Sequence, residues 1–243
     1  MKIDDFKPVG QFIRSIFFPQ CCAFCNTLIE SDEFVCKECD SRLPITGEET
    51  CLKCGCEKEF CDCSESEEHF YDGIAAPFYF EDGVRNSVFR LKFSGEKYIA
   101  EPLSDYMSDC FRKNFSDIEF DCITYVPMEK RKQKLRGYNQ SRLLAAHLSE
   151  KLNIKLADGL IYKYCSTDIQ HDLNYVERTG NIFGSFDVKN GKDLSGRNIL
   201  LVDDIKTTGS TLEECAKMLK LYGADKVFCL TVAVVKSKID KKK

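Results

Sequence analysis

The sequence predicts an α/β fold, in which a mainly parallel sheet with flanking helices follows a small cysteine-rich domain. Over the second part of the chain, short apolar runs alternate with helical stripes of apolar residues, which is typical of strands joined by helices. Ten of the 15 cysteines lie between Cys21 and Cys63. The 243 residues, 43% of them apolar, suffice for one sizeable core with a small domain beside it.

Residues 1–20 place apolar side chains at mostly helical spacing, so they predict a short amphipathic helix. A membrane-surface helix is the alternative, but its polar face is only weakly basic. The segment carries acidic residues and lacks a continuous apolar core, so we do not expect a signal peptide. No run of 18 apolar residues occurs in the chain, so we expect no integral membrane contact and a cytoplasmic location.

The cysteine-rich domain is expected over residues 21–69 and ends in the acidic linker 64–69. The α/β domain is expected over residues 70–236. Its strands are predicted at 71–80, 122–126, 198–202 and 226–235, and its helices at 84–91, 99–107, 144–152 and 212–219. Gly223 is a suitable C-terminal cap for the last of these helices. The lysine-rich residues 237–243 are expected to form a solvated basic tail.

The first cysteine group has the spacing of a metal site. In a reducing compartment, dense thiols indicate metal ligands rather than disulfides. Two C-x2-C pairs supply four thiolates, which match the tetrahedral coordination of Zn2+, and their members are Cys22, Cys25, Cys36 and Cys39. A closed four-thiolate shell leaves no position for substrate, so this Zn2+ is predicted to be structural. Cys21 adjoins Cys22 and could replace it.

The second cysteine group is less regular. It combines the pair Cys51-x2-Cys54 with Cys61-x-Cys63, and Cys56 lies between them. Five thiols therefore compete for four positions. We favour Cys51, Cys54, Cys61 and Cys63 as ligands of a second structural Zn2+. The alternatives are that Cys56 takes one of these positions, or that two of the thiols form a redox-active pair.

Residues 199–211, ILLVDDIKTTGST, predict a binding site for a sugar phosphate. A buried strand ends at Asp203 and Asp204, and a helix is expected to begin near Thr211. Free N–H groups at a helix N-terminus bind phosphate, and a glycine lets the backbone approach closely. The predicted phosphate-binding residues are Thr207, Thr208, Gly209, Ser210 and Thr211. Two carboxylates at a strand end suit the hydroxyls of a sugar, or a Mg2+ held by pyrophosphate.

A structural alternative explains part of the same segment. Ser210-x-x-Glu213 has the spacing of a capping box, in which the two side chains cap the first turn of a helix. This alternative accounts for the hydroxyl groups of the turn, but not for the two adjacent aspartates at the end of a strand.

A focused basic segment covers residues 127–142, where six basic residues stand against Glu129 alone. Arg131 and Arg136 can bind phosphate groups through bidentate hydrogen bonds. A solvated surface turn is the alternative for the segment. Asn139 and Gln140 are equally suited to a site contact and to a helix start. The whole chain carries a net charge of −4, so it does not attract nucleic acid as a whole.

These motifs resemble a known family. The stretch LLVDDIKTTGST is similar to the phosphoribosyl pyrophosphate motif of type I phosphoribosyltransferases. The wider pattern resembles the ComF family, which includes ComF and GntX-like proteins. It consists of FFPQCCAFC, the paired cysteine knuckles, VPMEKRKQKLRGYNQSRLLA and QHDLNYVERTGNIFGSF, in this order over nearly the whole chain. The pair Cys61-x-Cys63 departs from the C-x2-C that the family usually has, which leaves the second ligand set open.

The resemblance implies a type I phosphoribosyltransferase-like domain behind a double zinc ribbon. It also implies binding of phosphoribosyl pyrophosphate with Mg2+, and displacement of pyrophosphate from C1 of the ribose. Thr207 to Thr211 would hold the 5′-phosphate, Asp203 and Asp204 the ribose hydroxyls, and Arg131 and Arg136 the pyrophosphate. Arg178 and Asn181, in the stretch QHDLNYVERTGNIFGSF, are further candidate contacts.

The family is associated with natural competence, so a second function is open. In this alternative the chain is a non-catalytic accessory protein of DNA uptake, and its loop senses a ligand. Single-stranded DNA or competence proteins would be its partners. Several acidic residues in the cysteine groups count against direct DNA contact there. No residue is recognisable as a general base, and the acceptor nucleophile cannot be read from the sequence.

Overall fold

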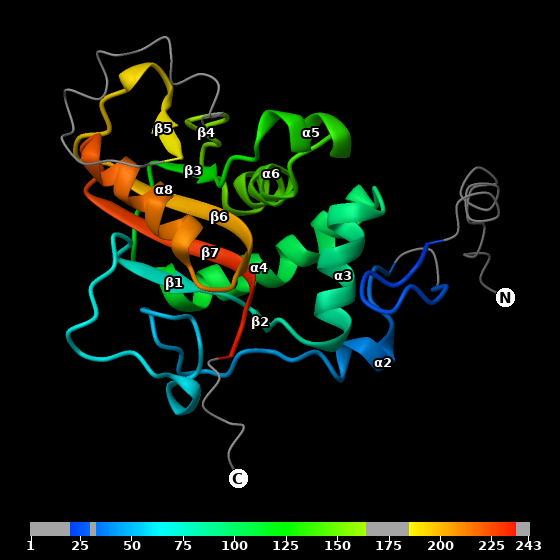
Figure 1. Ribbon diagram of the computed structural model, residues 1–243. Coiled ribbons are helices and arrows are strands. Elements are labelled where there is room, and N and C mark those ends of the chain that lie inside the picture. The colour runs from blue at the N-terminus through cyan, green and yellow to red at the C-terminus, as the bar shows by residue number, and fades with distance from the viewer. Residues whose placement is uncertain (1–19, 30–32, 164–184, 237–243) are drawn as a thin grey trace, which may run out of the picture.

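The computed structural model describes residues 20–29, 33–163 and 185–236 (Figure 1). The helix expected within residues 1–20 lies outside the described residues, except for Gln20 at its end. The basic tail 237–243 and the candidates Arg178 and Asn181 also lie outside them.

The centre of the molecule is a parallel sheet, as predicted. Within the described residues its strands are β1 (Gly73–Ala75), β2 (Phe78–Tyr79), β3 (Cys122–Tyr125), β6 (Asn198–Lys206) and β7 (Lys226–Val234). β7 pairs with β6 on one side and with β1 and β2 on the other, and β3 lies beyond β6. All of these pairings are parallel. The single strand expected at 71–80 is split at Pro77, which has no N–H to donate to the ladder.

Four predicted helices are confirmed on the two faces of this sheet. They are α3 (Asp82–Phe93), α4 (Ala100–Phe115), α6 (Gln140–Leu152) and α8 (Ser210–Leu221). Gly223 follows α8 with a φ of +97°, in agreement with its predicted role at the helix end. Figure 1 shows α8 crossing one face of β6 and β7.

Further short elements complete the described fold. A helix not predicted from the sequence, α5 (Lys130–Arg136), contains five of the six basic residues of the basic segment. A separate antiparallel ladder of β4 (Ile161–Lys163) and β5 (Phe186–Val188) was also not predicted. The remaining helical segments are α2 (Lys37–Asp40), η1 (Lys58–Phe60), η2 (Lys97–Ile99) and η4 (Lys189–Gly191). None of the described helices is long and apolar enough to cross a lipid bilayer.

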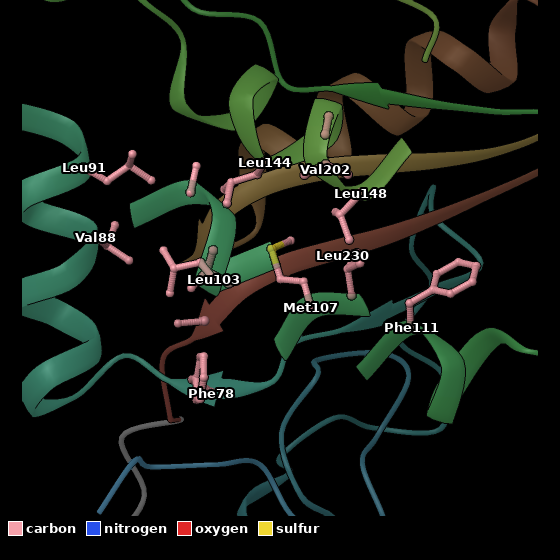
Figure 2. Close-up of a cluster of buried hydrophobic side chains, with 14 of the residues drawn as sticks. Phe78, Val88, Leu91, Leu103, Met107, Phe111, Leu144, Leu148, Val202 and Leu230 are labelled. Carbon is pink, nitrogen blue, oxygen red and sulfur yellow. The ribbon is translucent and has the colours of Figure 1, made fainter. Parts of the chain in front are cut away.

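Both faces of β6 are buried, which explains why its sequence is continuously apolar. Leu200 and Val202 pack with α3, α4 and α6 in one hydrophobic cluster, part of which Figure 2 shows. Ile199 and Leu201 point to the other face and pack with α8. This two-sided packing holds the carboxyl end of β6, where the candidate site lies, between helices on both faces.

Candidate functional site

The twin acids Asp203 and Asp204 lie within β6, near its carboxyl end. The strand was expected to end at these two acids, but it continues to Lys206, which still pairs with Val234 of β7. Both aspartates are therefore held by the sheet, and both side chains are buried. Ligands of open α/β sheets bind beyond the carboxyl ends of strands, and this is the end that the acids occupy.

Partners from α3 and α6 surround the two carboxylates. Asp203 Oδ1 accepts hydrogen bonds from Ser141 Oγ and from the backbone N–H of Asp204, both at 2.8 Å. Asp204 Oδ2 accepts one from Gln140 Nε2 at 2.5 Å. Asp204 Oδ1 lies 2.6 Å from Lys92 Nζ. The carboxylates are thus directed at the protein's own polar groups, which a ligand would have to replace.

Burial and the neighbouring charge perturb this pair. Burial in the protein, and then repulsion by Asp204, raise the pKa of Asp203 from its ordinary 3.8 to about 7. Hydrogen bonds from Ser141 and from the Asp204 N–H lower the pKa, but by less than burial raises it. Asp203 therefore titrates near neutral pH. A perturbed carboxyl at a strand end is typical of functional sites, although structural networks also produce one.

The loop after β6 is exposed and leads directly into α8. The side chains of Thr207, Thr208, Ser210 and Thr211 are exposed. Gly209 is the N-cap of α8 and has a φ of +84°, a left-handed conformation that favours glycine. The N-cap glycine has no side chain to cap this helix terminus, and Thr208 Oγ1 accepts a long hydrogen bond, 3.4 Å, from the Ser210 N–H.

The capping-box interpretation of this segment is wrong. α8 begins at Ser210, one residue before Thr211 and so close to the expected start, and Ser210 therefore occupies the first helical position and not the cap. The Glu213 carboxylate instead accepts a hydrogen bond from the backbone N–H of Phe70 at 2.9 Å and contacts His69 Nδ1. Glu213 thereby ties the linker after the cysteine-rich domain to the first turn of α8.

The two predicted arginines occupy different positions on α5. The Arg136 guanidinium donates a hydrogen bond to Gln140 Oε1, and its central carbon lies 5.0 Å from the centre of the Phe93 ring. Because Gln140 also contacts Asp204, Arg136 lies next to the twin acids. Arg131 is exposed on the same helix, one turn and a half earlier.

The structure separates the roles of two neighbouring residues that the sequence left open. Asn139 is the N-cap of α6: its side chain accepts a hydrogen bond from the Ser141 N–H and donates one to the Val126 carbonyl. Its role is therefore structural. Gln140, by contrast, contacts Asp204 and belongs to the site.

Two site residues were missed in the sequence. Ser141 follows Gln140, and its sequence position does not distinguish it from any other polar residue at the start of a helix. Lys92 lies in a different part of the chain, at the end of α3, and no local pattern connects it with β6.

The first cysteine group forms a compact cluster. The four Sγ atoms of Cys22, Cys25, Cys36 and Cys39 all lie within 4.8 Å of one another. Four sulfur atoms bound at about 2.3 Å to one Zn2+ would lie about 3.8 Å apart in a tetrahedron, so the cluster is compatible with a structural zinc site. Backbone N–H groups donate to two of the sulfurs, as is suitable for thiolates. Cys21 is not part of this cluster.

The second group gathers in the same way. The Sγ atoms of Cys51, Cys54, Cys61 and Cys63 lie within 4.8 Å of one another, and this cluster is also compatible with structural zinc. Cys56 lies outside it. Its side chain is buried in a small apolar cluster with Tyr79 and Val234.

Comparisons with known proteins relate this geometry to a family. The phosphoribosyl transferase domain family matches residues 139–243, which include α6, β6, the loop and α8. Competence protein ComFC from Bacillus subtilis is 30% identical, over 79% of this chain and 80% of its own length. DNA utilization protein YhgH from Escherichia coli strain K12 is 28% identical, over 86% of this chain and 88% of its own.

Solved structures of phosphoribosyltransferases are also similar to this chain. The purine phosphoribosyltransferase from Pyrococcus horikoshii is 18% identical, and the match covers 56% of this chain and 74% of that one, with a TM-score of 0.34.

Proposed function

Because this chain belongs to the ComF family of phosphoribosyltransferase-like proteins, we propose that it binds phosphoribosyl pyrophosphate with Mg2+ at the carboxyl end of β6 and transfers the phosphoribosyl group to an acceptor nucleophile. One observation carries the proposal: an exposed loop and a helix terminus with a glycine N-cap directly follow two buried acids on one strand. The loop suits a phosphate group and the acids suit the hydroxyls of the attached sugar.

The 5′-phosphate is assigned to Thr207 through Thr211. The first amides of α8 supply N–H donors and the positive end of the helix dipole. Thr208 Oγ1 and Ser210 Oγ already lie 2.9 Å apart, so both hydroxyls can donate to one phosphate. Gly209 keeps its backbone free of a side chain at the closest approach.

The ribose hydroxyls are assigned to Asp203 and Asp204. Gln140 and Lys92 donate to the two oxygens of Asp204. Two vicinal hydroxyls also donate hydrogen bonds, so they can replace these groups without leaving a carboxylate oxygen unpaired.

The pyrophosphate is assigned to Arg131 and Arg136 on α5. Their charges are permanent and their guanidinium groups match phosphate oxygens. As the leaving group departs, the sugar gains positive charge, and the buried acids stabilise that charge while the arginines stabilise the departing anion. Mg2+ bound by the pyrophosphate would neutralise further charge on the leaving group.

The two cysteine clusters are assigned to structural Zn2+, with no part in the transfer. Each cluster uses all four ligand positions, so neither ion has room for a substrate. The names of the relatives connect them with competence and DNA utilization. We propose that this chain serves the same process in the cytoplasm.

Calorimetric titration tests the binding proposal, since the chain has no tryptophan for a fluorescence assay. Wild type, Asp204→Asn and the control Asp109→Asn are titrated with phosphoribosyl pyrophosphate in the presence of Mg2+. Asp109 is an exposed acid on α4. We expect wild type and Asp109→Asn to bind alike, and Asp204→Asn to bind at least about tenfold more weakly, because a charged acceptor is lost. Absence of binding by wild type overturns the proposal.

Release of pyrophosphate then tests the transfer. Wild type is incubated with the bound ligand and a panel of nucleobases and amines, and pyrophosphate is measured by an enzyme-coupled assay. Release that depends on one acceptor supports catalysis. Binding with no release for any acceptor supports a ligand sensor instead.

A further inference from the structure

Lys92 is the one cation among the described residues that directly contacts the twin acids. Its Nζ lies 2.6 Å from Asp204 Oδ1, and its side chain is mostly buried. Neither the phosphoribosyl pyrophosphate motif nor the basic segment includes this residue. It also lies outside residues 139–243, which the phosphoribosyl transferase domain family matches.

The helix that carries Lys92 is fixed to the cysteine-rich domain. Asn86 Nδ2 donates to the carbonyl of Phe24 at 2.6 Å. One turn later, Arg90 Nη1 donates to the carbonyls of Cys22 and Ala23, both at 3.1 Å. These bonds hold α3 along its length against the first cysteine knuckle.

The end of α3 is fixed to the site as well. The Tyr138 hydroxyl donates to the backbone carbonyl of Leu91, next to Lys92. Tyr138 comes directly before the N-cap of α6, the helix that supplies Gln140 and Ser141. The position of Lys92 over Asp204 is therefore set by the same contacts that set the other partners of the acids.

Two adjacent buried carboxylates attract a divalent cation strongly, since Mg2+ prefers oxygen ligands such as carboxylates. In this chain an ammonium group already lies against one oxygen of Asp204, and the Gln140 amide lies against the other. A metal ion arriving alone would have to displace a positive charge that is held by a mostly buried side chain.

We propose that Lys92 controls the metal requirement of the site: its ammonium group neutralises Asp204, so that a divalent cation enters with the sugar phosphate and not before it. This inference rests on the proposed function in one respect: the ligand of the site is taken to bind together with a metal ion. When sugar hydroxyls bind Asp204, the Lys92 ammonium is released from its carboxylate. Lys92 is thus a residue that determines specificity and the order of binding.

Titration with Mn2+ alone, without sugar phosphate, tests the inference. Free Mn2+ is followed by its electron paramagnetic resonance signal in zinc-loaded wild type, Lys92→Met and Lys92→Gln. We expect both neutral variants to bind Mn2+ at least tenfold more tightly than wild type. Two neutral variants are used so that a folding defect in one, detected by circular dichroism, leaves the other to decide.

Three control variants test whether a gain in Mn2+ affinity comes from the loss of the Lys92 charge beside Asp204. Lys92→Arg keeps the charge and is expected to bind Mn2+ as weakly as wild type. Arg85→Met removes an exposed cation two turns earlier on α3 and is also expected to match wild type. The double variant Lys92→Met/Asp204→Asn is expected to lose the gained affinity.

The inference is overturned if neither neutral variant gains affinity for Mn2+, or if the gain survives the loss of Asp204. These outcomes do not depend on phosphoribosyl pyrophosphate. A wild-type chain that fails to bind that ligand overturns the proposed function, while the Mn2+ comparison still decides the role of Lys92.

Discussion

Replacement of Asp203 by Asn removes a carboxyl whose burial costs stability once the pH rises above its ordinary pKa of 3.8. The amide has nearly the same shape, and its oxygen can still accept the hydrogen bonds from Ser141 and from the backbone N–H of residue 204. What disappears is one of two adjacent negative charges. We therefore expect Asp203→Asn to stabilise the folded chain, and to do so more strongly at high pH than at low pH.

The magnitude follows from the pKa of Asp203. Its ordinary value is 3.8 and its value in the folded chain is about 7. Between these two values the folded chain holds a proton that the unfolded chain has released, so stability falls as the pH rises through this window. Within this window each pH unit lowers the free energy of unfolding by about 1.4 kcal/mol. The buried Asp203 therefore lowers the free energy of unfolding by about 4 kcal/mol at pH 8 and by about 2 kcal/mol at pH 5.

Urea denaturation of wild type and Asp203→Asn at pH 8 and at pH 5 measures this difference. The gain in unfolding free energy is expected to be about 2 kcal/mol larger at pH 8 than at pH 5. Any change in packing caused by the amide affects the unfolding free energy equally at both pH values. The cysteine clusters are the same in wild type and variant, so their contribution cancels in the comparison. The exposed acid Asp109, changed to Asn, is the control and is expected to show no such difference.

A gain of equal size at both pH values would refute the reasoning, because the effect would then not come from a titrating charge. A loss of stability at pH 8 would refute it too. That result would mean that the Asp203 charge is better compensated in the folded chain than its burial beside Asp204 implies.

Three further predictions concern other parts of the molecule. Cys56→Ser is expected to retain two zinc ions per chain and Cys54→Ser only one, as measured by mass spectrometry of the metals, because only Cys54 belongs to a cluster. Arg90→Met is expected to lower the unfolding free energy by about 3 kcal/mol in urea denaturation, because a buried cation that binds Glu96 and two backbone carbonyls is lost. Gly209→Ala is expected to cost about 1 kcal/mol of stability, since its φ is +84°, and to weaken ligand binding severalfold in calorimetry.

Most of the fold could be predicted because its signals are local. Continuous apolar runs predicted the buried strands β6 and β7. Apolar residues at helical spacing predicted the helices α3, α4, α6 and α8. The structure confirms these strands and helices. The errors occurred where context overrides the pattern. Residues 203–206 remain in β6, although three of them are charged, because Asp203, Ile205 and Lys206 continue to pair with β7. Pro77 interrupts a strand that alternation alone predicts.

The candidate site divides in the same way. By itself, the sequence determined the parts that lie close together along the chain: the cysteine knuckles, the twin acids and the loop that follows them. Spacing within a few residues dictates which atoms can meet, whatever the rest of the chain does.

Only the tertiary structure decided which distant groups complete these parts. Packing places Lys92 from α3 and Gln140 from α6 on Asp204. It leaves Cys56 outside the group of four sulfurs, although Cys54 packs against it, and it directs Glu213 to the linker rather than to its own helix. Such contacts depend on how the helices pack on the sheet. That packing results from the burial of many apolar side chains at once, so no short stretch of sequence contains it.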